Sequence, residues 1–362
     1  MRYPAMTVNR EKVLKNARAA AALCEEFGIE AWGVTKGLSG DPRLADIYCE
    51  AGFAGIADSR LRNLEKIRNA GVAAPLQLMR VAMRSELEDL VRWSDVSLQS
   101  EISTIIAIDE ICARVGATHD VLLMMDMGDL REGFLPGDLP PALPMLKDLK
   151  GGVRICGVAT NFACASGVLP TPENMAKLVS CRDMASDALG TEMPVVSVGG
   201  TCCLKIIEER AAPKEVNQLR ICEGILLGTD TAFDREIPYL AQDAITITAE
   251  IVECRLKPSV PEGETGLQAF GEKPVFADRG TRKRALLGMG RQDVNIDRIT
   301  PMERGVHIVT ASSDHLIVDV TDADSARPPD GGCKPGDTLR FRPLYPAMLA
   351  CSTSEYVDLV FE

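Results

Sequence analysis

Short apolar runs of strand length alternate with amphipathic helical stretches up to about Phe233, and this alternation restricts the possible folds more than any other feature of the chain. The strand-like runs lie at 31–35, 54–57, 76–79, 96–98, 121–125, 155–159, 195–198 and 219–221. Helical patterns lie between them, for example at 44–50, 61–70, 105–115 and 172–189. Eight such units are typical of a TIM (β/α)8 barrel, whereas a doubly wound open sheet, the alternative, has fewer strands.

The alternation stops after Phe233, and a different pattern follows. Strand-like runs lie at 244–254, 284–289, 306–311, 316–320, 338–341 and 356–361, separated by Gly, Pro and Asp turns such as 328–332, without a long helical pattern. This pattern predicts a small all-β domain. We therefore expect an α/β chain with a barrel domain over 1–235 and a C-terminal β domain over 236–362, and we leave open which of the two the first strand joins.

Composition narrows the possible partners. The 40 basic and 52 acidic residues give a net charge of −12, which argues against a nucleic-acid or anionic-membrane surface. No apolar run approaches the roughly 18 residues of a membrane span. The 12 cysteines form no C-x-x-C and no secretory signal precedes them, so we expect reduced thiols in a cytoplasmic protein. The three histidines lack metal-ligand spacing, so we expect no metal.

Residues that follow the carboxyl ends of barrel strands carry the chemistry of this architecture. The first run leads to Lys36, whose amine, once partly desolvated, is suited to Schiff-base chemistry. A lysine that only reaches the rim, or one that binds phosphate as a point charge, is the alternative. The fifth run leads to Arg131, which can either hold a carboxylate or phenolate over the barrel mouth or form an ordinary ion pair there.

A Gly-Gly turn, Gly199 and Gly200, follows the seventh run and precedes a predicted helix at 204–210. Glycines before a helix expose backbone N–H groups, and phosphate sites in barrels usually form after strands seven and eight. Arg220, on the eighth run, either faces a ligand there or pairs with Glu223. A phosphate site, an amine-reactive lysine and an arginine for a ring atom together indicate pyridoxal 5′-phosphate (PLP).

Longer stretches strengthen this interpretation when they are taken together. In the barrel they lie at 34–36, 40–42, 128–133 and 217–221, and in the β domain at 273–276, 290–294 and 311–316. With these stretches the chain resembles the alanine racemase-like PLP enzymes (fold type III), and most closely the ornithine racemase branch. The resemblance covers nearly the whole chain and implies a PLP-binding barrel followed by a β domain.

The resemblance implies a role for three barrel residues. Lys36 matches the Schiff-base lysine, which is also the base on one face of the cofactor. Arg131 matches the arginine near the phenolic oxygen and the substrate carboxylate. Arg220 matches the arginine that faces the pyridine nitrogen and leaves it unprotonated, which weakens the electron sink and favours reprotonation over side reactions.

The resemblance also implies contacts around the phosphate. Thr201 and Cys202 stand where alanine racemases have an Asn-Ser pair; the cysteine weakens the side-chain contact, although backbone N–H groups can still serve. Tyr345 matches the phosphate-binding tyrosine of the β domain, and Asn161 stands at a histidine position. The stretch 220–228 is one residue longer than in alanine racemases, so Glu223 competes for the pyridine nitrogen.

One departure affects the second base. Alanine racemases use a tyrosine of the partner subunit on the opposite face of the cofactor, and Phe270 stands there in this chain. His315 is our candidate for the far-face base, and a histidine without a role is the alternative. Asp314, beside it, aligns with the aspartate that binds the distal amine of ornithine in fold-related decarboxylases.

We therefore expect a PLP-dependent racemase that interconverts L- and D-ornithine, or a similar basic or small amino acid. Lys36 would remove the α-proton on one face, and a group of the partner subunit would return it on the other. The resemblance implies a homodimer with shared active sites. The alternatives are a PLP-dependent decarboxylase of the same fold, a PLP-binding protein without turnover, and a cofactor-free lysine aldolase.

Overall fold

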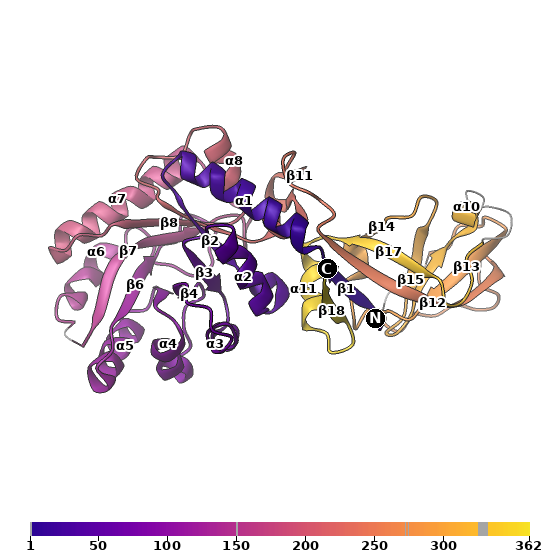
Figure 1. Ribbon diagram of the computed structural model, residues 1–362, viewed down its shortest axis with the longest axis horizontal. Coiled ribbons are helices and arrows are strands. Elements are labelled where there is room, and N and C mark those ends of the chain that lie inside the picture. Colours follow the sequence, from indigo (N-terminus) through magenta and orange to yellow (C-terminus); the bar gives the residue numbers. More distant parts are fainter. Residues whose placement is uncertain (1, 150, 272, 274, 325–331) are drawn as a thin grey trace. The chain divides into compact units, whose positions relative to one another are not determined.

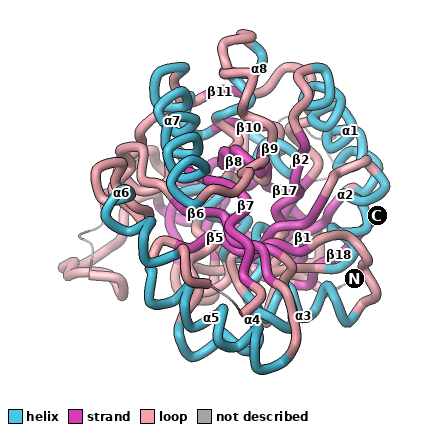
Figure 2. Tube along the Cα trace, turned by 90° about the vertical axis from the view of Figure 1, so that its left-hand side faces the viewer, coloured by secondary structure: helices cyan, strands magenta, loops and turns pink. Residues whose placement is uncertain are grey.

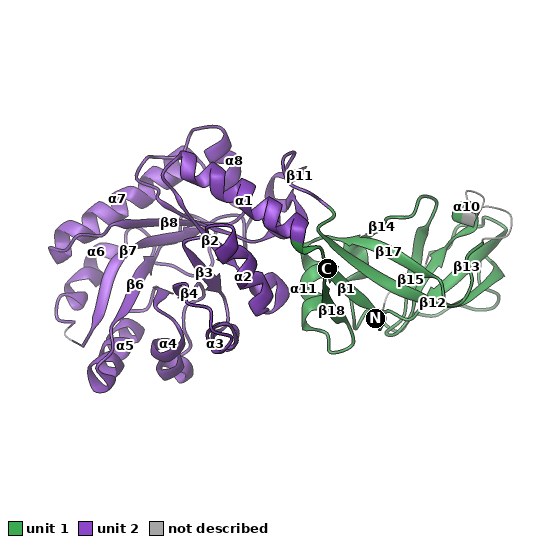
Figure 3. Cartoon of the chain, in the orientation of Figure 1, with its two compact units in different colours: residues 1–10, 243–362 green, residues 11–242 purple. Residues whose placement is uncertain are grey.

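The computed structural model describes residues 2–149, 151–271, 273, 275–324 and 332–362. The chain divides into two compact units, a barrel unit over Glu11–Gln242 (purple) and a β unit over Met1–Arg10 and Asp243–Glu362 (green) (Figure 3). The barrel unit therefore extends beyond the boundary that we expected after residue 235, and the chain's first strand belongs to the β unit. Positions 328–331 of the predicted turn, and position 274, lie outside the described residues.

Eight parallel strands close into a barrel in the barrel unit, so the expected fold is confirmed (Figure 1). They are β2 (Glu30–Val34), β3 (Gly55–Asp58), β4 (Leu76–Leu78), β5 (Val96–Gln99), β6 (His119–Met124), β7 (Val153–Asn161), β8 (Val195–Gly199) and β9 (Gln218–Ile221). Strand β2 pairs with β9 and closes the ring. Because every strand is parallel, all the carboxyl ends meet at one face of the barrel.

Helices surround the strands, which lie at the centre of the barrel unit in Figure 2. They are α1 (Arg10–Glu26), α2 (Pro42–Glu50), α3 (Leu61–Asn69), α4 (Leu87–Trp93), α5 (Ile102–Val115), α6 (Leu139–Ala142), α7 (Pro172–Leu189), α8 (Cys203–Glu208) and α9 (Glu223–Leu227). Local sequence sets their ends. Asp41 accepts a hydrogen bond from the Arg43 N–H before α2, and Thr171 and Asn174 form a capping box before α7.

The barrel interior contains polar as well as apolar side chains. The fully or almost fully buried polar residues on its strands include Gln77, Ser97, Gln99, His119, Ser197, Gln218 and Arg220. Close contacts also restrict the strand that leads to Lys36: a Cβ on Gly33 would lie 2.2 Å from the Tyr48 ring. Glycine is therefore required at this point of β2 for the buried ring to pack against the strand.

The β unit is an antiparallel sheet with one parallel pair at its edge. Its strands are β1 (Ala5–Val8), β12 (Ile245–Pro258), β13 (Thr281–Leu287), β14 (Ile299–Pro301), β15 (His307–Ala311), β16 (Leu316–Asp319), β17 (Thr338–Pro343) and β18 (Asp358–Phe361). Strand β1 pairs antiparallel with β12 and parallel with β18. The unit also contains α11 (Tyr345–Thr353), a helix that the sequence pattern did not predict.

Candidate active site

Lys36 lies two residues after the end of β2, at the start of a short 3-10 turn, and is half-buried. The residue before it, Thr35, is fully buried and donates from Oγ1 to Asp58 Oδ2 at 2.7 Å. The other Asp58 oxygen accepts from the Arg60 N–H and from Asn63 Nδ2, both at 2.9 Å. Burial raises the pKa of Asp58 above its usual value. These contacts fix the end of β2 to the end of β3, and the sequence analysis did not identify Asp58.

Arg220 lies on β9 and is only 1% exposed. Its guanidinium donates to Ser197 Oγ, to the Thr160 carbonyl at 2.6 Å and to Asn161 Oδ1 at 3.0 Å. Burial lowers the pKa of Arg220 to about 10, and the positive charge of Arg131 adds to this effect. The side chain therefore stays cationic at neutral pH, and all three of its hydrogen-bond acceptors are neutral groups.

Two buried donors at this level of the barrel lack an acceptor within the described residues. Asn161, Gly199 and Arg220 are consecutive register partners across β7, β8 and β9. Asn161 Nδ2 and Arg220 Nε are both buried without a hydrogen-bond partner. Gly199 keeps the two side chains together, because a Cβ there would lie 2.2 Å from Asn161 Oδ1 and 2.5 Å from Arg220 Nη2. Unpaired buried donors of this kind fit a ligand that offers hydrogen-bond acceptors.

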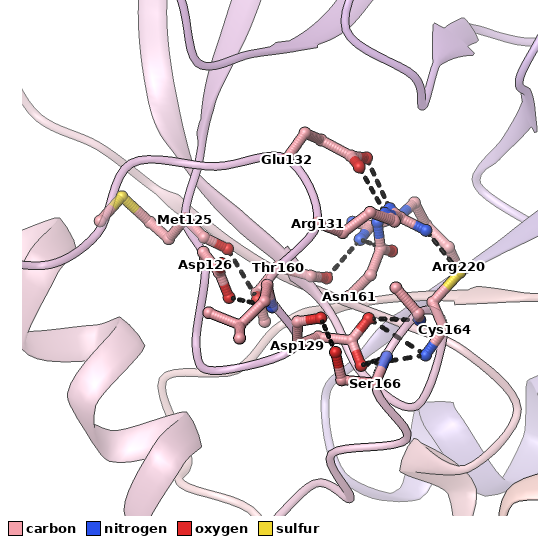
Figure 4. Close-up of polar contacts among 12 residues, drawn as sticks. Met125, Asp126, Asp129, Arg131, Glu132, Thr160, Asn161, Cys164, Ser166 and Arg220 are labelled. Carbon is pink, nitrogen blue, oxygen red and sulfur yellow. Dashed lines mark hydrogen bonds and ion pairs between the residues drawn. The ribbon is translucent and has the colours of Figure 1, made fainter.

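Arg131 lies in the loop after β6, where it contacts the Glu132 carboxylate and Cys164 Sγ (Figure 4). The ion pair that we gave as the alternative role of Arg131 therefore exists. Arg131 is also close enough to Arg220 to lower its pKa. The Glu132 carboxylate opposes this effect, and an anionic ligand at the barrel mouth would likewise accept from the guanidinium of Arg131.

Asp129 holds the loop after β7 against the loop of Arg131 (Figure 4). Its buried carboxylate accepts backbone N–H groups of Ala165 at 2.7 Å and Ser166 at 3.1 Å, and also those of Cys164 and Val168. Although burial opposes it, these N–H groups hold the pKa of Asp129 below its usual value. Asp129 thus positions the segment that carries Cys164 against Arg131, and the sequence analysis did not identify it.

The family of the chain follows from a match over residues 8–221 with “Alanine racemase, N-terminal domain”. The chain belongs to this family. A relative described as “Lysine racemase” from Thermotoga maritima is 37% identical over 100% of this chain and 99% of its own length. One described as “Ornithine racemase” from Acetoanaerobium sticklandii is 34% identical over 98% of this chain and 99% of its own length. The expected racemase class is confirmed, and the alternatives are not favoured.

Solved structures share the fold at low sequence identity. Alanine racemase from D-cycloserine-producing Streptomyces lavendulae has a TM-score of 0.76 at 15% identity, covering 99% of this chain and 96% of that one. D-threonine aldolase from Filomicrobium marinum has a TM-score of 0.72 at 19% identity, covering 97% and 89%. At these identities the likeness establishes the architecture, while the relatives that span the whole chain indicate the activity.

The expected phosphate contacts, Thr201 and Cys202, lie buried between β8 and α8. Thr201 Oγ1 accepts the Gly224 N–H at 3.0 Å, so this hydroxyl ties the two loops together. The Cys202 thiol is directed to the Phe162 carbonyl at 3.9 Å. Within the described residues the backbone N–H groups of Thr201 and Cys202 have no acceptor. The two residues therefore offer backbone donors to a phosphate, whereas their side chains are already engaged.

Glu223 engages its own segment rather than Arg220. Its Oε1 accepts from Thr229 Oγ1 at 2.8 Å and from Thr231 through both the hydroxyl and the N–H. Burial raises the pKa of Glu223. None of the contacts described for Arg220 involves this carboxylate. The geometry therefore places Arg220, and not Glu223, at the level of the unpaired donors.

The remaining predicted residues belong to the β unit. His315 and Asp314 are exposed between β15 and β16, where Asp314 accepts from Gln292 Nε2 at 2.6 Å. Phe270 lies under the Arg291 guanidinium, 5.1 Å from the ring centroid. Tyr345 is half-buried and begins α11. The roles of His315, Asp314 and Tyr345 at the barrel site remain predictions.

Proposed function

We propose that this family member is a PLP-dependent racemase of a basic amino acid, with lysine or ornithine as the substrate. The observation that carries the proposal is the unpaired Arg220 Nε, held beside the unpaired Asn161 Nδ2 at the carboxyl end of a barrel whose first strand leads to Lys36. The two relatives that span the whole chain support the substrate class, because their names specify lysine and ornithine.

The residues present fit PLP. The cofactor, when bound, supplies the electron sink that makes the α-hydrogen of an amino acid acidic. Lys36 Nζ would attach it and then remove or return the α-proton on one face. Arg220 Nε would donate to the ring nitrogen, and Arg131 would hold the phenolic oxygen and the substrate carboxylate. The backbone N–H groups of Thr201 and Cys202 would contact the phosphate.

The β unit would complete the site across a homodimer. In this proposal Tyr345 contacts the phosphate, His315 exchanges the α-proton on the far face and Asp314 binds the distal ammonium of the substrate. The exposure of His315 and Asp314 in the single chain supports roles at a partner's site. No helix of the described ranges has the length and hydropathy needed to cross a membrane. A cytoplasmic location remains a prediction from the cysteine pattern.

Incubation of the PLP-loaded protein with single L-amino acids in D₂O tests the proposal. We expect lysine or ornithine to yield the D-enantiomer with deuterium at Cα, because inversion requires exchange of the α-proton. Lys36→Ala should lose the visible cofactor band and the reaction, whereas Lys177→Ala, at an exposed position on α7, should keep both. Release of CO₂, or inversion only of neutral amino acids, would contradict the proposal.

A further inference from the structure

A chain of buried hydrogen bonds runs from Arg220 into the barrel interior. Ser197, on β8, accepts from Arg220 Nη1 and donates to Gln218 Oε1 at 2.5 Å. Gln77 Nε2, on β4, approaches the same oxygen at 3.5 Å. Ser197 and Gln77 are fully buried, and Gln218 is only 4% exposed. The chain therefore lies away from solvent, where an unmade hydrogen bond is costly.

The chemistry of the three groups gives this chain one direction. A guanidinium only donates, so Ser197 must accept from Arg220 and its own hydrogen is left for another acceptor. Gln218 Oε1 is the acceptor within reach. Each group thus fixes the next one: Gln218 orients the hydroxyl, and the oriented hydroxyl presents its lone pair to the guanidinium.

The other acceptors of Arg220 differ from Ser197. The Thr160 carbonyl is fixed by the backbone of β7, and Asn161 is itself part of the candidate site. Ser197 is thus the acceptor whose orientation depends on a further side chain. Because three neutral acceptors hold the cation, loss of one leaves a buried charged donor unpaired and frees the guanidinium to rotate.

We infer that Ser197 and Gln218 are positioning residues, which orient Arg220 through the hydrogen bonds from Arg220 Nη1 to Ser197 Oγ and from Ser197 Oγ to Gln218 Oε1. This inference rests on the proposed function, in which Arg220 Nε meets the ring nitrogen of PLP. In this inference neither residue contacts the cofactor itself, and both would act through the Arg220 guanidinium.

Ser197→Ala tests the first bond, and Ser97→Ala is its matched control. Ser97 is equally buried, on β5, and bonds Gln99 and His119 instead. We expect Ser197→Ala to weaken PLP binding about tenfold or more, since hydrogen bonds to charged groups contribute on this scale. The visible band of bound PLP changes with pH when the nitrogen that joins Lys36 to the cofactor loses its proton. The midpoint of this change should fall, because a less well held guanidinium lets the ring nitrogen gain a proton, and that positive charge disfavours a second one on the Lys36 nitrogen. Ser97→Ala should keep the wild-type affinity and midpoint.

Gln218→Met tests the second bond, because methionine has a similar shape and cannot accept from the hydroxyl as the amide oxygen does. Gln218→Met should weaken PLP binding and lower the pH midpoint of the visible band, as Ser197→Ala does, but by less. In the double variant, Gln218→Met should add nothing, because without the hydroxyl Gln218 no longer acts on Arg220. Additive losses, wild-type behaviour of Ser197→Ala, or equal losses in Ser97→Ala would overturn the inference.

Urea unfolding without cofactor separates this inference from the proposed function. It is measured for the wild type, Ser197→Ala, Gln218→Met and the double variant. If the wild type binds no PLP, the proposed function fails. The hydrogen bonds among Arg220, Ser197 and Gln218 are then tested by the free energies of unfolding alone. In this double-mutant cycle the losses caused by the two substitutions should again be non-additive. Additivity there would overturn the inference independently of any cofactor.

Discussion

At the scale of single residues, His119 shows how burial controls charge. It is 1% exposed at the start of β6, with Nε2 2.9 Å from Ser97 Oγ. Burial lowers its pKa to about 4, so it is neutral in the folded protein at neutral pH. In the unfolded chain a histidine titrates near pH ~6.5. Between these values only the unfolded state gains the proton, so stability should decrease on acidification, by up to about 3 kcal/mol.

Urea unfolding at a series of pH values from about 7 down to about 4.5 measures this effect. His119→Gln, which cannot gain a proton, should show a smaller decrease in the free energy of unfolding over that range. Equal slopes in the wild type and His119→Gln would show that the histidine is not held neutral.

At the scale of elements, the stability of the paired ends of β2 and β3 should depend on the Thr35 hydroxyl. Thr35→Val keeps the side-chain shape but removes the donor to Asp58 Oδ2. The buried carboxylate then keeps its contacts at Oδ1 and loses this one, so we expect a loss of about 1–3 kcal/mol in unfolding free energy. Thr35→Ser, which keeps the hydroxyl, should lose less. A Thr35→Val protein as stable as the wild type in urea would contradict this role for the Thr35–Asp58 contact.

The elements also show what the sequence could predict. All eight barrel strands were predicted, because strands buried on both faces read as apolar runs. Strand β1 could not be assigned to a unit, because its partners β12 and β18 lie at the other end of the chain. Helix α11 was missed, although the Pro in its first turn is a usable start signal.

In the candidate site, too, sequence could predict the residues at strand ends but not those whose roles depend on contacts between strands. The positions of the strand ends predicted Lys36, Arg131 and Arg220, because the carboxyl ends of parallel strands meet at one face. They could not predict Ser197 and Asp58, whose roles depend on hydrogen bonds to neighbouring strands and not on their own position. The polar Ser197 between buried valines of β8 was the available signal that the barrel interior carries a polar chain.

At the scale of the whole molecule, the proposed homodimer predicts complementation between two inactive variants. Lys36→Ala removes the proposed base of the barrel unit, and Asp314→Ala removes the proposed partner of the distal ammonium from the β unit. If each site takes Lys36 from one subunit and Asp314 from the other, a mixed dimer has one site with both residues intact. Mixing the two variants should restore up to about half of the wild-type activity per mixed dimer.

Recovery should follow subunit exchange, measured with differently tagged chains, and Lys36→Ala mixed with Lys36→Ala should recover nothing. If mixed dimers form and remain inactive, the two residues do not come from different subunits, and Asp314 then acts within its own chain or not at all.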